Sequence, residues 1–459
     1  MAALRQTGLW CVIGVLSICL AVPVWAQTEE EAMEGEAAAS LRPRLSFGLE
    51  SKTNFRDSEL NRFAVPFPHP PSHIPPGQTR VFEETVNEGS HLEISSVSLL
   101  LDASWGDGLA AHGKVDFIDL YDRNPTSEDK KVDVDEAWIR FGVETEPAVL
   151  APRSGVYLKL GKLPKFERQD DRHLESYGLV STAFNRFEDT GAELGASFGR
   201  HIYLKASVTQ GNPVFIRDPN ALAGDNGTPL FLQPNPDPEL KSGIVILYDA
   251  EVEDVDVDGD PEIGAGLGLR FADEAGRNGV DVLAWAYQRT LAGTVDLEGT
   301  FYGGDLDVMN GPDNIRGLLG ISGDEKREFG ANLWLYLGGL SFFGQYVDQE
   351  LAGLPRTGIE GEIAWRFELP LIWAIGERQL FPFLAPAVRY SKLDNDFRNH
   401  PQTAVPSLAW DWEKLDVGVR LGIFPGTDLT LEYADNSFIL GSGAEAENNE
   451  TLATLRWRV

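Results

Sequence analysis

The sequence predicts an all-β chain that closes into a transmembrane antiparallel β-barrel of about 16 strands, with 18 as the alternative. Three observations predict this fold. They are an amphipathic strand at the C-terminus, period-two alternation along most of the chain, and a number of strand segments that would give a closed barrel a lumen too wide for side chains to fill. In lipid, unpaired backbone groups are costly, so strands cross a membrane only as a closed barrel.

The C-terminal strand, residues 451–459, alternates apolar and polar side chains to its last residue. Leu455, Trp457 and Val459 share one face, and Arg456 and Arg458 share the other. We expect the first face to meet outer-membrane lipid and the arginines to face the lumen. Signals for barrel-assembly machinery, an expected partner, usually end in an aromatic residue, and Trp457 is the nearest one here.

The same alternation recurs along the chain. In residues 262–271, for example, Ile263, Leu267 and Phe271 oppose Glu262 and Arg270, with three glycines on the polar side. We count about 16 to 18 such segments of near membrane-spanning length. A closed barrel of this size has a lumen too wide for side chains to fill, so the polar faces should point into water.

The connections are of two kinds. Residues 198–201, 337–340 and 424–427 are short and suit periplasmic turns. Residues 56–88, 165–190 and 212–241 are long and suit extracellular loops or a constriction folded into the barrel. Aromatic residues at strand ends predict interfacial girdles, although aromatics are also common in strands generally. The girdle set is Trp105, Tyr121, Phe271, Tyr287, Tyr346, Trp365, Tyr390, Tyr433 and Trp457.

The N-terminus predicts secretion. Residues 1–26 have one basic residue, Arg5, an apolar run from Leu9 to Leu20, and a small-residue cleavage signal ending at Ala26. Both cysteines, Cys11 and Cys19, lie in this signal peptide. Residues 27–40 form an acidic, flexible segment, and residues 41–459 form the single barrel domain. The expected location is the outer membrane of a Gram-negative cell.

The chain is strongly acidic. Its formal charge is -32, and removal of Arg5 with the signal peptide makes it -33. Nucleic acid is therefore excluded as a partner, because its binders need basic surface. Two interpretations stay open: a solvated surface that resists aggregation, or an acidic vestibule that enriches cations.

The polar strand faces predict the pore lining, which mixes both signs of charge. Predicted lining residues are Lys114, Asp116, Glu136, Arg140, Lys159, Glu193, Lys205, Arg270, Glu360, Glu362, Arg366, Asp416, Arg420, Glu432, Arg456 and Arg458. One loop gathers further charges and is the candidate constriction; the alternative is a salt-linked loop resting on the rim. Its residues are Arg168, Asp170, Asp171, Arg172 and His173, followed by Glu175.

No metal, cofactor or catalytic site is predicted. Asp254, Asp256 and Asp258 imitate the start of an EF-hand, but the twelfth loop position falls on Ala265, inside a strand. Loose divalent-cation binding by these aspartates is the alternative. Residues 195–199 match the letters Gly-x-Ser-x-Gly, but they run into the predicted tight turn between two strands and lead to no helix, so they are not a nucleophile elbow and we expect no enzyme.

Three stretches resemble the phosphate-selective porin O/P family: 136–142 (EAWIRFG), 156–166 (VYLKLGKLPKF) and 186–194 (RFEDTGAEL). The resemblance is strongest over residues 130–200. It implies a trimer of 16-stranded barrels in the outer membrane. Members of that family line the pore with arginines and lysines, whereas the lining predicted here has both signs, so phosphate selectivity is not expected.

The expected function is passive diffusion of small hydrophilic solutes or ions through a water-filled pore, with selectivity set by width and charge. One alternative is a dedicated export or uptake barrel for a charged polysaccharide such as alginate, which a continuous arginine track would favour. Another is an outer-membrane enzyme or adhesin.

Overall fold

The chain divides into two units, Met1–Arg42 and Pro43–Val459. The computed structural model describes parts of the second unit only: residues 43–59, 62–64, 82–86, 89–106, 108–117, 132–144, 154–170, 172–184, 188–211, 214–216, 243–244, 250–252, 260–273, 277–290, 297–301, 304–305, 325–351, 353–376, 378–396, 411–439, 445–447 and 449–459. The predicted signal peptide and acidic segment lie outside the described residues and stay predictions, as does the cleavage after Ala26.

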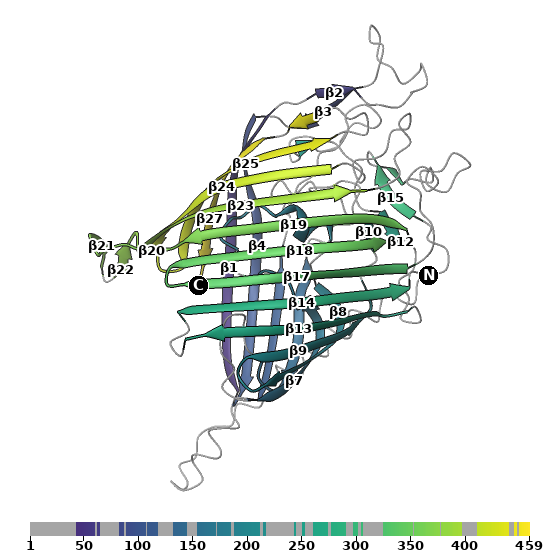
Figure 1. The fold of residues 1–459 in the computed structure, drawn as a ribbon. Helices are drawn as coiled ribbons and strands as arrows, with labels where there is room; N and C mark the ends of the chain where they lie inside the picture. Colours follow the sequence, from purple (N-terminus) through teal and green to yellow (C-terminus); the bar gives the residue numbers. More distant parts are fainter. Residues whose placement is uncertain are drawn as a thin grey trace. The chain divides into compact units, whose positions relative to one another are not determined.

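Sixteen strands form a closed antiparallel ring, which confirms the predicted fold class (Figure 1). In ring order they are β1 (Arg44–Ser58), β4 (Gly89–Trp105), β5 (Leu109–Asp116), β6 (Asp133–Phe141), β7 (Gly155–Pro164), β8 (Glu188–Phe198), β9 (Ile202–Thr209), β13 (Glu262–Ala272), β14 (Asn278–Thr290), β17 (Glu325–Leu337), β18 (Leu340–Leu351), β19 (Leu354–Trp365), β23 (Phe383–Asn395), β24 (Asp411–Phe424), β25 (Thr427–Ile439) and β27 (Glu450–Arg458). Two short pieces, β20 (Phe367–Glu368) and β26 (Glu445–Glu447), bring the sheet to 18 strands but pair only with β23 and β25.

The first and last strands close the ring. β27 pairs with β1 from Glu50 opposite Arg458 to Ser58 opposite Glu450. Beyond that ladder, the Leu49 N–H donates to the Val459 carbonyl at 2.9 Å, and the Val459 N–H donates back to Leu49 at 3.0 Å. Closure satisfies the backbone groups that an edge strand would leave unpaired.

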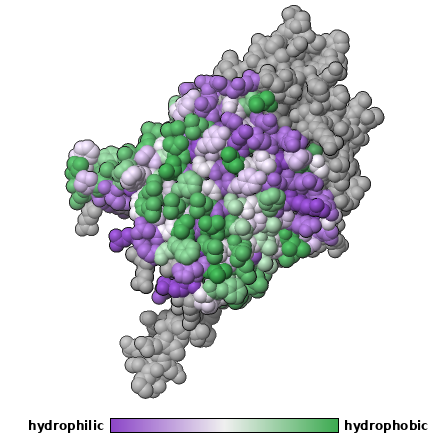
Figure 2. Space-filling model, viewed as in Figure 1, coloured by the Kyte–Doolittle hydropathy of each residue, from purple (hydrophilic) through white to green (hydrophobic). Residues whose placement is uncertain are grey.

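The strands separate polar from apolar residues as period two requires. In β13, Ile263, Leu267 and Phe271 are exposed on the outer face, while Glu262 and Arg270 are buried on the inner face. Large apolar residues cover much of the outer surface (Figure 2). This arrangement reverses the usual pattern of a soluble protein.

Aromatic rings lie over the glycines of β13. A Cβ at Gly268 would lie 1.9 Å from Cζ of Tyr203, and one at Gly264 would meet the ring of Tyr287 at 2.3 Å. The glycines therefore allow rings from the neighbouring strands to pack against the inner wall. Tyr287 is thus buried inside the barrel, so its predicted place in an outer girdle is wrong. Tyr121 lies outside the described residues.

The connections alternate between two ends of the barrel. At the end that we call the turn end, 199–201, 338–339 and 425–426 are the predicted tight turns. The connection 366–382 at this end contains β20, β21 (Trp373–Ile375) and β22 (Arg378–Leu380). The other end, the loop end, carries the long connections with short strands β2 (Arg62–Ala64), β3 (Phe82–Val86), β10 (Val214–Ile216), β11 (Gly243–Ile244), β12 (Ala250–Val252), β15 (Leu297–Phe301) and β16 (Gly304–Asp305).

Helix is scarce. The short helix α3 (Leu179–Ala183) follows β7 and precedes β8. In the part of the chain that the structure describes, no helix has the length and apolar character needed to cross a membrane.

Candidate pore lining and constriction

One segment enters the barrel after β7 ends at Pro164. We call residues 165–170 and 172–184 the inward segment. Near its start, Tyr287 of β14 donates its hydroxyl to the Glu167 carboxylate at 2.5 Å, and Asn332 of β17 donates to the Glu167 carbonyl at 2.5 Å. Near its end, Arg356 of β19 donates to the Ala183 carbonyl at 2.7 Å. The segment therefore follows the inner wall of strands more than 100 residues away in sequence.

Wall carboxylates hold the backbone of this segment. A segment inside a barrel has no strand to pair with, so its N–H groups need other acceptors. The N–H groups of His173, Glu175 and Val180 donate to Glu362, Glu432 and Glu360 at 2.9, 2.9 and 3.2 Å, respectively. From the wall, Lys414 of β24 donates to the Tyr177 carbonyl at 2.7 Å.

Apolar packing supports the same arrangement. Leu179, Val180, Ala183 and Phe184 are buried in a core inside the barrel. Inner-face residues that complete this core include Trp285, Trp334, Phe343, Val347, Leu393, Trp412 and Phe438. Gly358 of β19 makes room for it, since a Cβ there would lie 2.5 Å from the Phe184 ring.

This placement corrects the predicted role of four acids. Glu360, Glu362, Asp416 and Glu432 lie on the inner face, but the inward segment covers them, so they do not face open water. Arg389 of β23 is also fully buried, and its guanidinium lies 2.8 Å from Asp416, 3.6 Å from Glu362 and 3.8 Å from Glu432. All four acids therefore anchor the segment, Asp416 by accepting from the Ser176 hydroxyl at 3.1 Å, and three of them lie around one arginine.

A cluster of cations surrounds Glu175 on the other side of the segment. The Glu175 carboxylate lies 3.0 Å from Lys52 of β1, 2.8 Å from Arg420 of β24 and 3.9 Å from Arg456 of β27. Burial would raise the pKa of Glu175, but the three cations lower it from 4.5 to about 2. Asp428 adds a second carboxylate, 2.8 Å from Arg456.

Arg172 and Tyr177 extend this cationic cluster. The Arg172 guanidinium lies 4.1 Å from the centre of the Tyr177 ring. This cation is the main reason why the pKa of the Tyr177 hydroxyl is lowered below its usual value. His173 points elsewhere, with Nδ1 2.9 Å from Glu362. Asp171 lies outside the described residues, and Asp170 pairs with Arg168 at 2.7 Å.

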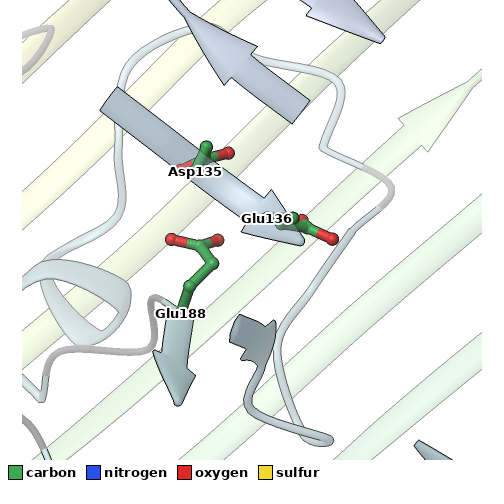
Figure 3. A group of neighbouring side chains, drawn as sticks. All are labelled: Asp135, Glu136 and Glu188. Carbon is green, nitrogen blue, oxygen red and sulfur yellow. The ribbon is translucent and has the colours of Figure 1, made fainter. Parts of the chain in front are cut away.

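Three carboxylates lie close together on the part of the wall formed by β6 and β8: Asp135 and Glu136 of β6, and Glu188 of β8 (Figure 3). Each offers an oxygen within 4.8 Å of the others, the only such group among the residues described. Two cations already engage them: Lys114 lies 2.6 Å from Asp135, and Arg168 lies 2.8 Å from Glu136 and also contacts Glu188. Two cations thus engage the three carboxylates, and each cation is shared with one further acid, Lys114 with Asp116 and Arg168 with Asp170. Asp254, Asp256 and Asp258 lie outside the described residues.

The other predicted lining residues are also paired. Glu144, in the connection after β6, contacts Arg140, Lys159 and Lys205 at 3.4, 2.7 and 3.1 Å. The further pairs are Lys114 with Asp116 (3.2 Å), Lys205 with Glu193 (3.6 Å), Arg270 with Asp281 (3.1 Å) and Arg458 with Glu50. Arg366 follows the end of β19 and is half exposed beside Glu368 at the turn end, away from the covered wall.

The two signs of charge are not equally accessible. In most of these inner pairs the cation is the more exposed member: Lys114 is 29% exposed and Asp116 9%, and Lys52 is 22% exposed and Glu175 6%. Arg456 and Asp428 follow the same order, at 19% and 12%. The exceptions are Asp170 beside Arg168, Glu144 beside Lys159 and Lys205, Asp428 beside Arg420, and the acids beside the fully buried Arg389 and Arg56. Among the described ion pairs of the lining, the accessible members are therefore more often cations than the sequence composition suggests.

Sequence reasoning missed several of these residues. Arg389 could have been found by period two, because the apolar residues Val388 and Tyr390 flank it in the sequence. Lys52 offered no such signal, because its neighbours Ser51 and Thr53 in β1 are polar too. Glu144 offered none, since it lies in a connection and meets its partners only through the fold.

The fold and the inward segment define a closed antiparallel barrel narrowed by an internal loop. Solved structures similar to this chain include the outer-membrane channel DcaP of Acinetobacter baumannii (8% identity, TM-score 0.48, covering 94% of this chain and 100% of that one). OprB of Pseudomonas putida is similar at 9% identity and a TM-score of 0.46, covering 92% and 96%. OmpT of Vibrio cholerae, an outer-membrane protein in trimer form, is similar at 12% identity and 0.44, covering 91% and 99%.

At such low scores and identities, no conclusion about function follows from these likenesses. No protein-family model matches the sequence, and the comparison with curated proteins gives no match. The likeness to the phosphate-selective porin O/P family therefore stays a resemblance of pattern.

Proposed function

We propose that this chain is an outer-membrane porin through which small hydrophilic solutes or ions diffuse passively, with the inward segment as its constriction. The carrying observation is the combination of an apolar, exposed outer face with an ionic inner face in a closed ring. Lipid suits the first face and water the second. The inward segment narrows the lumen on the side of β17–β19 and β23–β25.

The charge pattern supports a modest preference for anions, in spite of the chain's net charge. The partly exposed cations Lys52, Arg456 and Lys114 lie above more deeply buried acids, so a solute in the pore meets the cations first. Each of these cations has a carboxylate partner, and that partner lowers the affinity of the cation for an anion in the pore. Phosphate selectivity is therefore not proposed.

Described inner arginines are engaged by carboxylates: Arg140 by Glu144, Arg168 by Glu136, and both Arg420 and Arg456 by Glu175 and Asp428. A polysaccharide barrel would favour a continuous track of free arginines, so these pairs favour the porin. The homotrimer, the assembly machinery and export through the signal peptide are proposed from the sequence alone. Cross-linking of the folded protein tests the trimer.

Single-channel recording tests the function. The folded protein in a planar bilayer should give ohmic conductance steps, and a KCl gradient should give a reversal potential of the anion-selective sign. A folded sample without conductance would rule out the porin, and the opposite sign would rule out the anion preference.

A matched pair of variants tests the cationic cluster. Lys52→Gln removes an accessible cation, so its reversal potential should move toward cation selectivity. Glu175→Gln removes the carboxylate that three cations share, so its potential should move the other way. Equal shifts in the same direction would contradict the assignment of Lys52 and Glu175 to the pore.

A further inference from the structure

An apolar hairpin stands out at the turn end of the barrel. Between β19 and β23, strand β21 pairs with β22, with Trp373 opposite Leu380 and Ile375 opposite Arg378. Figure 1 shows this hairpin projecting beyond the ends of the neighbouring strands, and Figure 2 shows large apolar side chains on it. Four of its residues are mostly exposed: Leu371 69%, Ile372 67%, Trp373 61% and Ile375 70%.

The base of the hairpin is tied to the wall, so its direction is defined. Phe381 donates its N–H to the Ile423 carbonyl of β24 at 3.0 Å, and Leu369 donates to the Pro382 carbonyl at 2.9 Å. The Phe381 φ is 54°, a left-handed conformation that bulky side chains rarely adopt. The Phe381 ring packs edge-on against Trp373 at 5.8 Å. The chain therefore accepts local strain at the base of an apolar projection.

The exposed residues continue the apolar outer face of the barrel. Trp365, at the end of β19, stacks on Phe367 at 5.2 Å, and both rings are about half exposed. Phe367 leads directly into the hairpin. A surface that is contiguous with a lipid-facing wall meets the same lipid if it lies at the membrane boundary.

The residue types also suit that boundary. Tryptophan and aliphatic side chains bury their apolar parts below the headgroups, and arginine reaches the phosphates. Arg378 is exposed opposite Ile375, and Arg366 is exposed before the hairpin begins. Together they place cationic groups beside the apolar residues.

We propose that residues 371–376 and 378–380 form an interfacial anchor that inserts into the phospholipid leaflet at the turn end of the barrel. This inference rests on the proposed membrane location and adds a contact outside the strand ring. Leu371, Ile372, Trp373 and Ile375 enter the acyl region, and Arg378 binds lipid phosphate.

A site-specific fluorophore tests the anchor. The chain without its predicted signal peptide has no cysteine, so Ile375→Cys accepts a single environment-sensitive label. Arg200→Cys, in the tight turn 199–201 at the same end, is the matched control. Both proteins are folded into vesicles of phosphatidylethanolamine and phosphatidylglycerol, with or without lipid brominated in the upper acyl chain, and folding is checked by heat-modifiable gel migration.

The label at 375 should emit at shorter wavelength than the label at 200 and should be quenched by the brominated lipid about twofold more strongly. Equal water exposure of both labels in folded barrels would overturn the anchor alone. Protection from aqueous iodide without quenching by brominated lipid would also overturn it, because the hairpin would then meet a second copy of the chain. Failure of the barrel to insert would overturn the proposed membrane location and the anchor with it.

Discussion

At the scale of single residues, a buried arginine links the wall of this barrel to the segment inside it. Arg389 is fully buried among Asp416, Glu362 and Glu432, which also bind the inward segment. A buried carboxylate without a partner destabilises the folded state, because the free energy lost on leaving water is not offset by an ion pair. The arginine thus links the wall to the constriction.

Arg389→Gln should lower the free energy of unfolding by about 3 to 5 kcal/mol, since the surrounding carboxylates lose their shared cation. Arg327→Gln is the control: Arg327 pairs with Glu325 on the exposed surface and should change stability by less than about 1 kcal/mol. Urea unfolding in detergent, followed by heat-modifiable migration, measures both. Equal midpoints for the two variants would contradict the role of Arg389.

Glu175 makes stability depend on acid. Its pKa is 4.5 in the unfolded chain and about 2 in the folded one, so its stabilising effect is complete above pH 4.5 and is lost as the pH falls toward 2. The full effect is up to about 3 kcal/mol. Glu175→Gln cannot titrate, so the difference in unfolding free energy between the two proteins should shrink over this range. A difference that stays constant with pH would contradict the lowered pKa.

At the scale of elements, the sequence predicts the strands better than what lies between them. Ile263 and Arg270 already show which face of β13 points outward, because period two needs only local residues. The inner aromatic residues Trp285 and Trp412 do not follow from that pattern. They are buried because the inward segment packs on them, and its partners lie far away in sequence.

Because these contacts are distant in sequence, the sequence predicts which charged residues line the barrel but only partly predicts which of them contact one another or face water. The lining charges come from strand faces, which the alternation identifies. Which of them face water depends on the inward segment, so Glu360 and Asp416 are covered while Lys114 is accessible. No spacing in the sequence specifies where a loop of this length comes to rest.

The packing of α3 on β19 gives an element-level prediction. Gly358→Ala places a Cβ 2.5 Å from the Phe184 ring, so the helix must shift, at a cost of about 1 to 3 kcal/mol. Conductance should change with it, because the helix belongs to the proposed constriction. Gly361→Ala is the matched control on the same strand, where the nearest atom lies 3.7 Å away and neither property should change. Normal conductance and stability in Gly358→Ala would contradict the packed position of α3.

At the scale of the whole molecule, stability depends on closing the ring between the two ends of the described chain. β1 and β27 are nearly 400 residues apart in sequence, and Thr454 donates its hydroxyl to Asn54 at 2.8 Å across this last seam. Every other pair of neighbouring strands in the ring consists of two barrel strands that follow one another along the chain. The seam therefore forms only when the rest of the wall is in place, and it converts an open sheet into a barrel.

Thr454→Pro should prevent closure, because proline removes a ladder N–H in a strand that is paired on both sides, with Asn54 on β1 and Thr430 on β25. We expect loss of the heat-modifiable folded form and of channel activity. Thr454→Val keeps a β-branched shape and loses only the hydroxyl contact, at a cost of about 1 kcal/mol, so it should still fold. If Thr454→Pro folds and conducts as Thr454→Val does, the ring is not held at this seam, and the C-terminal strand has no special role in closing the barrel.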